Sequence, residues 1–85
     1  MESIIINLSD SKPLYIQIYE HIRNGIINGD YRKNEPLPSI RGLAKALSVS
    51  KITVEKAYDQ LCSEGYIVGR ERSRYYVAEL SELTF

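Results

Sequence analysis

A chain of 85 residues predicts one domain, and a hydrophobic fraction of 44% suffices for one compact core and argues against disorder. A single cysteine excludes an internal disulfide, and the sequence has no cluster of Cys and His residues that would indicate a metal site. The apolar runs are too short to cross a bilayer, so a soluble cytoplasmic protein is expected. The formal net charge of zero argues against a nucleic-acid partner, but seven basic and four acidic residues lie between Arg41 and Arg74, which leaves a basic face possible.

The first predicted helix follows a short lead-in. Residues 1–12 are this lead-in, which could be a short strand, a packing arm or a partly ordered tail. Pro13 opens the helix, where its missing N–H costs nothing, and Gly29 ends it. Apolar residues recur between them at spacings of three and four: Tyr15, Ile18, Tyr19, Ile22 and Ile26. Residues 30–38 then form a connector with two prolines, in which Leu37 could donate a short strand.

Two more helices are expected next, joined by a tight turn. Ser39 is a suitable N-cap for a helix that ends at Leu47, and Ser50 caps another over about residues 51–64. Both helices have apolar residues at positions i, i+3, i+4 and i+7: Ile40, Leu43, Ala44 and Leu47 in the first, and Val54, Ala57, Tyr58 and Leu61 in the second. This layout is a helix-turn-helix.

A β-hairpin completes the predicted fold. Residues 66–68 and 75–77 are β-branched or aromatic and should form its strands, joined by a polar, mostly basic loop at 69–74. The predicted class is mainly α with a small antiparallel sheet, a three-helix winged helix-turn-helix whose wing is the hairpin. The domain is expected over residues 13–79, with 80–85 as a tail or the start of a linker to a C-terminal domain.

The outward side of the third helix is the first candidate binding surface. In a helix-turn-helix, the first residues of the second helix enter the major groove of DNA. Here these residues are Lys51, Ile52, Thr53 and Lys56. Lysine can reach phosphate or guanine, threonine can bond base edges or phosphate, and an outward isoleucine can contact a thymine methyl group.

Phosphate contacts are expected beside this helix. Ser39 and Ser50 cap helix N-termini, whose free N–H groups and partial positive charge suit phosphate. Arg41 lies in the first turn of the second helix and should hold the DNA backbone. The basic hairpin can follow the backbone or enter a minor groove, and its candidate residues are Arg70, Arg72, Ser73 and Arg74.

Other functional classes are also considered. Any of these charged residues could be ordinary solvated surface, and zero net charge with outward Ile16, Ile27 and Ile52 favours a winged-helix module that binds another protein. No nucleophile motif, glycine-rich phosphate loop or pair of carboxylates at useful spacing is found, so no enzyme is expected.

Three segments closely resemble the N-terminal domain of GntR-type regulators: PSIRGLA at 38–44, LSVSKITV at 47–54 and LCSEGYI at 61–67. The resemblance covers nearly the whole chain. Residues 13–19 and 54–58 look most like two branches of that family. One is the MocR branch, whose second domain is aminotransferase-like and binds pyridoxal phosphate. The other is the YtrA branch, which has a short C-terminal dimerisation segment.

The resemblance implies sequence-specific DNA binding by a bacterial transcriptional regulator, as a homodimer on a palindromic or repeated operator. It also implies that a further domain senses an effector. Pyridoxal phosphate would bind only in that domain, and no cofactor is expected in this segment. The family's DNA contacts fall here on Ser39, Arg41, Ser50, Lys51, Thr53, Lys56 and the hairpin around Arg70 to Arg74.

Two positions depart from the family pattern. Ser48 stands where the turn usually has glycine, and a left-handed backbone there would cost on the order of 1 kcal/mol. Arg72 and Arg74 stand where the wing tip usually has glycines, which favours insertion of side chains over a close approach of the backbone.

Overall fold

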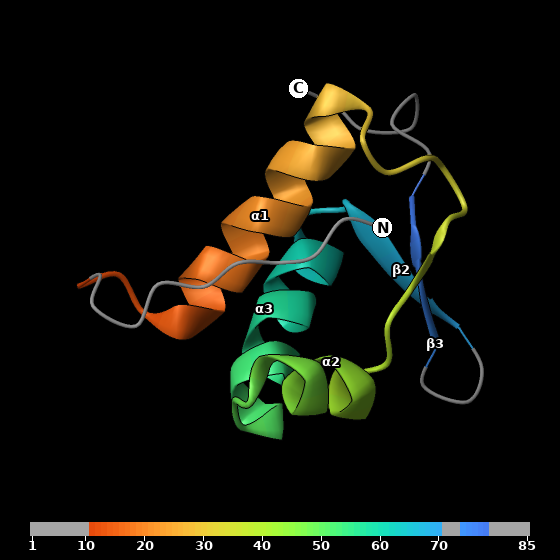
Figure 1. Ribbon diagram of the computed structural model, residues 1–85. Coiled ribbons are helices and arrows are strands. Elements are labelled where there is room, and N and C mark those ends of the chain that lie inside the picture. The colour runs from red at the N-terminus through yellow and green to blue at the C-terminus, as the bar shows by residue number, and fades with distance from the viewer. Residues whose placement is uncertain (1–10, 71–73, 79–85) are drawn as a thin grey trace.

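The structure, a computed structural model, describes residues 11–70 and 74–78 (Figure 1). Over these residues the elements are α1 (Leu14–Asn28), β1 (Pro36–Leu37), α2 (Ile40–Leu47), α3 (Lys51–Ser63), β2 (Ile67–Arg70) and β3 (Arg74–Val77). Helix α3 packs against α1, α2 and β2, so it is the central element. The predicted class of three helices and a small antiparallel sheet is confirmed for this part of the chain. The predicted tail at 80–85, and the lead-in up to residue 10, lie outside the described residues.

The sheet has the strand order β1–β3–β2, and both pairings are antiparallel. Leu37 lies opposite Tyr75, which confirms the short strand predicted at Leu37. The hairpin strands are longer at the loop end than predicted, because Gly69 pairs with Tyr75 and Arg70 with Arg74. Polar residues on the solvated face of a sheet can form the same backbone hydrogen bonds to a neighbouring strand as apolar residues. The prediction of a loop over all of residues 69–74 was therefore wrong.

The helix ends follow the predicted signals. Pro13 is the N-cap of α1, and Gly29 ends that helix in the left-handed region at φ 84°. Helix α2 ends at Leu47, and its C-cap Ser48 is also left-handed at φ 58° and ψ 42°. Helix α3 ends at Ser63, with Glu64 as its C-cap, within one residue of the predicted boundary. Ser48, a residue with a Cβ in a glycine position, therefore has the left-handed backbone that costs on the order of 1 kcal/mol.

The core lies between α1, α3 and the inner face of the sheet. All four predicted core positions of α3 are fully buried: Val54, Ala57, Tyr58 and Leu61. In α2 the predicted buried stripe is fully covered only at Leu43 and Ala44, whereas Ile40 and Leu47 at its two ends are partly buried.

Tyr58 connects this core to the start of α2. Its ring packs edge-on against Tyr75 of β3, with 4.9 Å between ring centroids. Its hydroxyl donates a hydrogen bond of 2.7 Å to the carbonyl oxygen of Pro38, directly before the cap of α2. Burial, and then the neighbouring Tyr75 and Tyr31, raise the pKa of Tyr58. The phenol therefore remains a neutral donor that fixes the position of the α2 N-terminus relative to α3.

Candidate nucleic-acid interface

The N-terminus of α2 is capped as predicted. The Ser39 hydroxyl accepts a hydrogen bond of 2.9 Å from the backbone N–H of Gly42. A Cβ at Gly42 would lie 2.9 Å from that oxygen, so glycine gives the cap its room. The first turn contains no acidic side chain, although acids are favoured at that end of a helix. Its remaining N–H groups are therefore available to an anion from outside the chain.

The N-terminus of α3 has the same construction. The Ser50 hydroxyl accepts from the backbone N–H of Thr53 at 3.2 Å, and the first turn again contains no acidic residue. The two side-chain oxygens of Ser50 and Thr53 lie 2.9 Å apart and share a hydrogen bond. The Thr53 hydroxyl is thus already engaged in the cap, on the half-buried flank of the helix.

The two helix N-termini meet in an open surface depression, which we call the α2–α3 hollow. It is lined by Ser39, Ile40 and Arg41 from α2, and by Lys51, Ile52 and Glu55 from α3. Four of the residues predicted to bind DNA line this hollow together, namely Ser39, Arg41, Lys51 and Ile52. Ile52 is 65% exposed, so the outward position predicted for this apolar side chain is confirmed. Sequence reasoning did not predict that Ile40 and Glu55 would line this surface. A helical wheel of α3, considered together with the start of α2, could have indicated Glu55.

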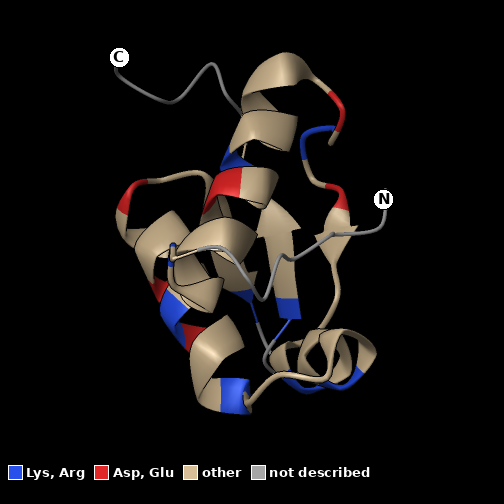
Figure 2. Ribbon diagram, turned by 60° about the vertical axis from the view of Figure 1, so that its left-hand side comes forward, with Lys and Arg blue, Asp and Glu red and all other residues tan. Residues whose placement is uncertain are grey.

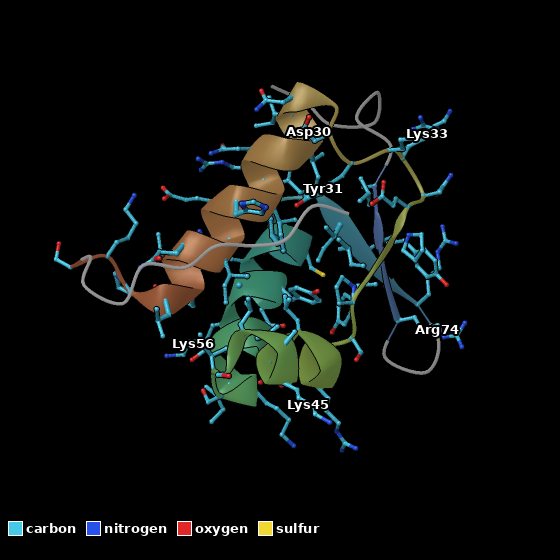
Figure 3. The ribbon with its side chains drawn as sticks, in the orientation of Figure 1. Asp30, Tyr31, Lys33, Lys45, Lys56 and Arg74 are labelled. Carbon is cyan, nitrogen blue, oxygen red and sulfur yellow. The ribbon has the colours of Figure 1, made fainter. Side chains whose placement is uncertain are left out.

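Lys56 lies on the other flank of α3. Its ammonium nitrogen is 5.6 Å from the centroid of the Tyr15 ring in α1, a cation–π contact. Lys56 is exposed, as predicted, but it does not line the hollow with Lys51. In Figure 3 it lies on the α1 side of the molecule, and Arg74 lies on the opposite side.

The hairpin arginines lie on the outer face of the sheet. Side chains alternate along a strand, and Tyr75 and Val77 face the helices, so Arg74 and Tyr76 face outward. Arg70 lies directly opposite Arg74 and is on the same face. Its guanidinium group is 4.6 Å from the centroid of the Tyr76 ring and donates to Asn34 at 3.4 Å. Arg70 is therefore held over the outer face of the sheet, although it is exposed, as is Arg74. Arg72 and Ser73 lie outside the described residues.

The charges are distributed unevenly over the molecule. The stretch from 39 to 54 contains Arg41, Lys45 and Lys51 and no acidic residue. Helix α2, the start of α3 and the hairpin end all lie at the lower end of the molecule in Figures 1 and 2, and lysine and arginine colour this end in Figure 2. The neutral net charge thus hides a local basic surface, as the sequence had left possible.

Acidic groups lie on the flank of α3 that faces the sheet. The pKa of Tyr75 is raised, first by burial and then by the nearby Cys62, Asp59 and Glu55. Burial likewise raises the pKa of the Cys62 thiol, which keeps the thiol protonated. Among the described residues, no group of three or more His, Cys, Asp or Glu side chains could hold a metal ion.

With this geometry in view, comparison with known proteins decides the family. The family model of bacterial regulatory proteins of the gntR family matches residues 14–77. The chain belongs to the GntR family. This match confirms the resemblance seen in the sequence, and with it the winged helix-turn-helix class typical of that family's transcriptional regulators.

Two curated relatives are HTH-type regulators of this family. YdeL of Bacillus subtilis is 47% identical over 64 residues, which are 75% of this chain and 14% of that protein. The probable rhizopine catabolism regulatory protein MocR of Rhizobium meliloti is 35% identical over 77 residues, which are 91% of this chain and 16% of that protein. The GntR-family chain described here thus spans a small fraction of the length of these relatives.

Solved structures agree with the fold. YtrA from Sulfolobus acidocaldarius, a GntR-family transcription factor, superposes with a TM-score of 0.84 at 43% identity, over 89% of this chain and 65% of that one. The DNA-binding domain of AraR in complex with operator ORX1 gives a TM-score of 0.75 at 25% identity, over 89% of this chain and 95% of that one. Within the described residues, no helix is long and apolar enough to cross a membrane.

Proposed function

We propose that this chain binds double-stranded DNA in a sequence-specific manner, as the operator-binding part of a transcriptional regulator. The observation that carries the proposal is the α2–α3 hollow, where two capped helix N-termini, two cations and one exposed isoleucine share one open face. The complex of the related AraR domain with its operator supports the same docking for this chain.

The first half of α3 would lie in the major groove. Lys51 and Ile52 are exposed at its entrance, so Lys51 can donate to guanine or phosphate oxygens and Ile52 can contact a thymine methyl group. The phosphates beside the groove would bind Arg41 and the N–H groups at the Ser39 and Ser50 caps, which position the protein without reading sequence.

The remaining predicted contacts would lie at the edges of this interface. Lys56, held over Tyr15, would reach a phosphate on the α1 side of α3. Thr53 would contribute through the cap that it shares with Ser50. The wing would follow the backbone or enter the minor groove through Arg72, Ser73 and Arg74, with Arg70 supporting the sheet from its contact with Tyr76.

The full-length regulator would act as a homodimer in the cytoplasm, and this chain would act by binding rather than catalysis. The regulator names of its relatives support binding rather than catalysis. The alternative of a protein-binding module has less support, because the exposed apolar residues Ile27, Ile52 and Val68 belong to three different elements. Ile27 is near the end of α1, and Ile52 is at the start of α3. These two helix ends lie at opposite ends of the molecule (Figure 1). Separate residues of this kind are normal on a monomer surface.

The test is binding of the 85-residue chain to DNA selected from a library of randomised duplexes, measured by fluorescence anisotropy. The double variant Lys51→Ala, Lys56→Ala should lose at least tenfold in affinity, because it removes two phosphate- or base-contacting cations. The control Arg32→Ala, Lys33→Ala removes the same charge from the connector, at the other end of the molecule (Figure 3), and should lose less than threefold. Equal affinities of the double variant and the wild type, or affinity independent of salt, would contradict the proposal.

A further inference from the structure

Glu55 is an acidic residue in the surface that we propose to face the phosphates of DNA. It lines the α2–α3 hollow together with Lys51 and Ile52, and its side chain is exposed. Among the residues that the structure describes, it has no hydrogen-bond or ion-pair partner. A carboxylate placed against DNA phosphates lowers affinity through charge repulsion, and that cost is not offset by a contact within the described chain.

The chemistry of the base edges decides what such a carboxylate can bind. An ionised carboxylate only accepts hydrogen bonds. In the major groove, guanine and thymine present acceptors, whereas cytosine presents its N4 amine and adenine presents an amine beside the N7 acceptor. A carboxylate is therefore repelled by guanine and thymine, meets one acceptor on adenine, and meets only a donor on cytosine.

We propose that Glu55 determines operator specificity by accepting a hydrogen bond from the N4 amine of a cytosine in the major groove. This inference rests on the proposed docking of α3 in that groove. Lys51 precedes Glu55 by one helical turn on the same side of α3, and both residues line the hollow. Since the guanine paired with that cytosine offers O6 and N7 as acceptors, Lys51 and Glu55 together match one C·G base pair.

The neighbouring residues define the position of that base pair. Ile52 precedes Glu55 by three residues, so the two side chains are neighbours on the helix surface. The cytosine should thus lie next to the thymine whose methyl group Ile52 contacts. Asp59, one turn further along α3, does not line the hollow, so it repels phosphates without reading a base.

The experiment selects duplexes from a library with a randomised central region, using the wild-type chain, Glu55→Gln and Asp59→Asn. In the wild-type motif, one position beside a thymine should be cytosine, and its replacement by guanine should lower affinity about tenfold. Glu55→Gln should keep the rest of the motif and change this one position to adenine, because a glutamine amide pairs with N6 and N7 of adenine. Asp59→Asn, the matched control, should bind all duplexes more tightly and keep cytosine. Thermal unfolding of each variant checks that these exposed substitutions leave the fold intact.

The possible failures differ from one another. An identical motif for the wild type and Glu55→Gln, or a wild-type motif without a cytosine position, overturns the role of Glu55 and leaves DNA binding standing. A wild-type chain that enriches no motif overturns sequence-specific binding itself, and the role of Glu55 with it. A change of the motif by Asp59→Asn equal to that by Glu55→Gln would assign the effect to charge alone.

Discussion

Helix α3 has a buried side and an exposed side, and the two sides differ in what a substitution there should change. On the buried side Val54, Ala57, Tyr58 and Leu61 have no exposed surface and contact the core. On the exposed side Lys51, Ile52 and Glu55 line an open hollow and contribute little to packing. One helix can therefore carry folding stability on one side and DNA recognition on the other, and the two properties should vary independently.

The largest expected effect tests this separation directly. Leu61→Ala should lower the free energy of unfolding by about 3 kcal/mol, because it removes a fully buried side chain and leaves a cavity. Ile52→Ala, the matched control, also removes an apolar side chain, but one that is 65% exposed, and should lower it by less than about 0.5 kcal/mol. Urea unfolding followed by circular dichroism measures both. Equal losses would mean that the exposed side of α3 also carries stability.

The next effect concerns the two exposed lysines of α3. Lys51→Ala should lower DNA affinity about tenfold, because Lys51 lines the hollow at the helix N-terminus. Lys56→Ala should lower it about threefold, because Lys56 lies over Tyr15 on the other flank and can reach only a phosphate. Anisotropy titrations at several salt concentrations measure both. A larger effect of Lys56 than of Lys51 would place the bound DNA nearer to α1.

A smaller effect should appear on the buried side as a dependence on pH. Burial raises the pKa of Tyr58, so the fold favours the neutral phenol. This contribution to stability is present in full below the unfolded-state pKa of about 10 and is lost as pH rises toward the folded-state pKa. Tyr58→Phe should lower stability by about 1 kcal/mol at pH 7, through loss of the hydrogen bond to Pro38, and should lessen the decline of melting temperature above pH 10. An unchanged decline would assign it to other groups.

The smallest effect concerns the turn that joins α2 to α3. Ser48→Gly should raise the free energy of unfolding by about 0.5 kcal/mol, because glycine relieves the left-handed strain at φ 58° but has more freedom to lose on folding. DNA affinity should stay within twofold, since Ser48 does not line the hollow. Thermal unfolding and anisotropy on the same samples measure the two quantities. A destabilised variant would show that Ser48 makes a favourable contact that outweighs its backbone strain.

Much of the fold could be predicted because its signals are local. The caps at Ser39 and Ser50, the left-handed Ser48 and the apolar spacing of α3 all depend on residues within one or two helical turns. The errors arose where distant residues meet. The hairpin strands were predicted too short, because pairing of Arg70 with Arg74 depends on the partner strand and not on β-propensity.

The sequence alone determined the three helices, the hairpin and the outward position of Ile52 and Lys56, because periodicity fixes the angle of each residue about its own helix axis. Only the tertiary structure decided which neighbour each of these exposed side chains meets. Lys56 lies over Tyr15 of α1, whereas Lys51 and Glu55 lie beside the start of α2. The physical reason is that the packing of α1 and α2 on α3 depends on side chains far apart in the chain, and no local pattern records which of them become neighbours.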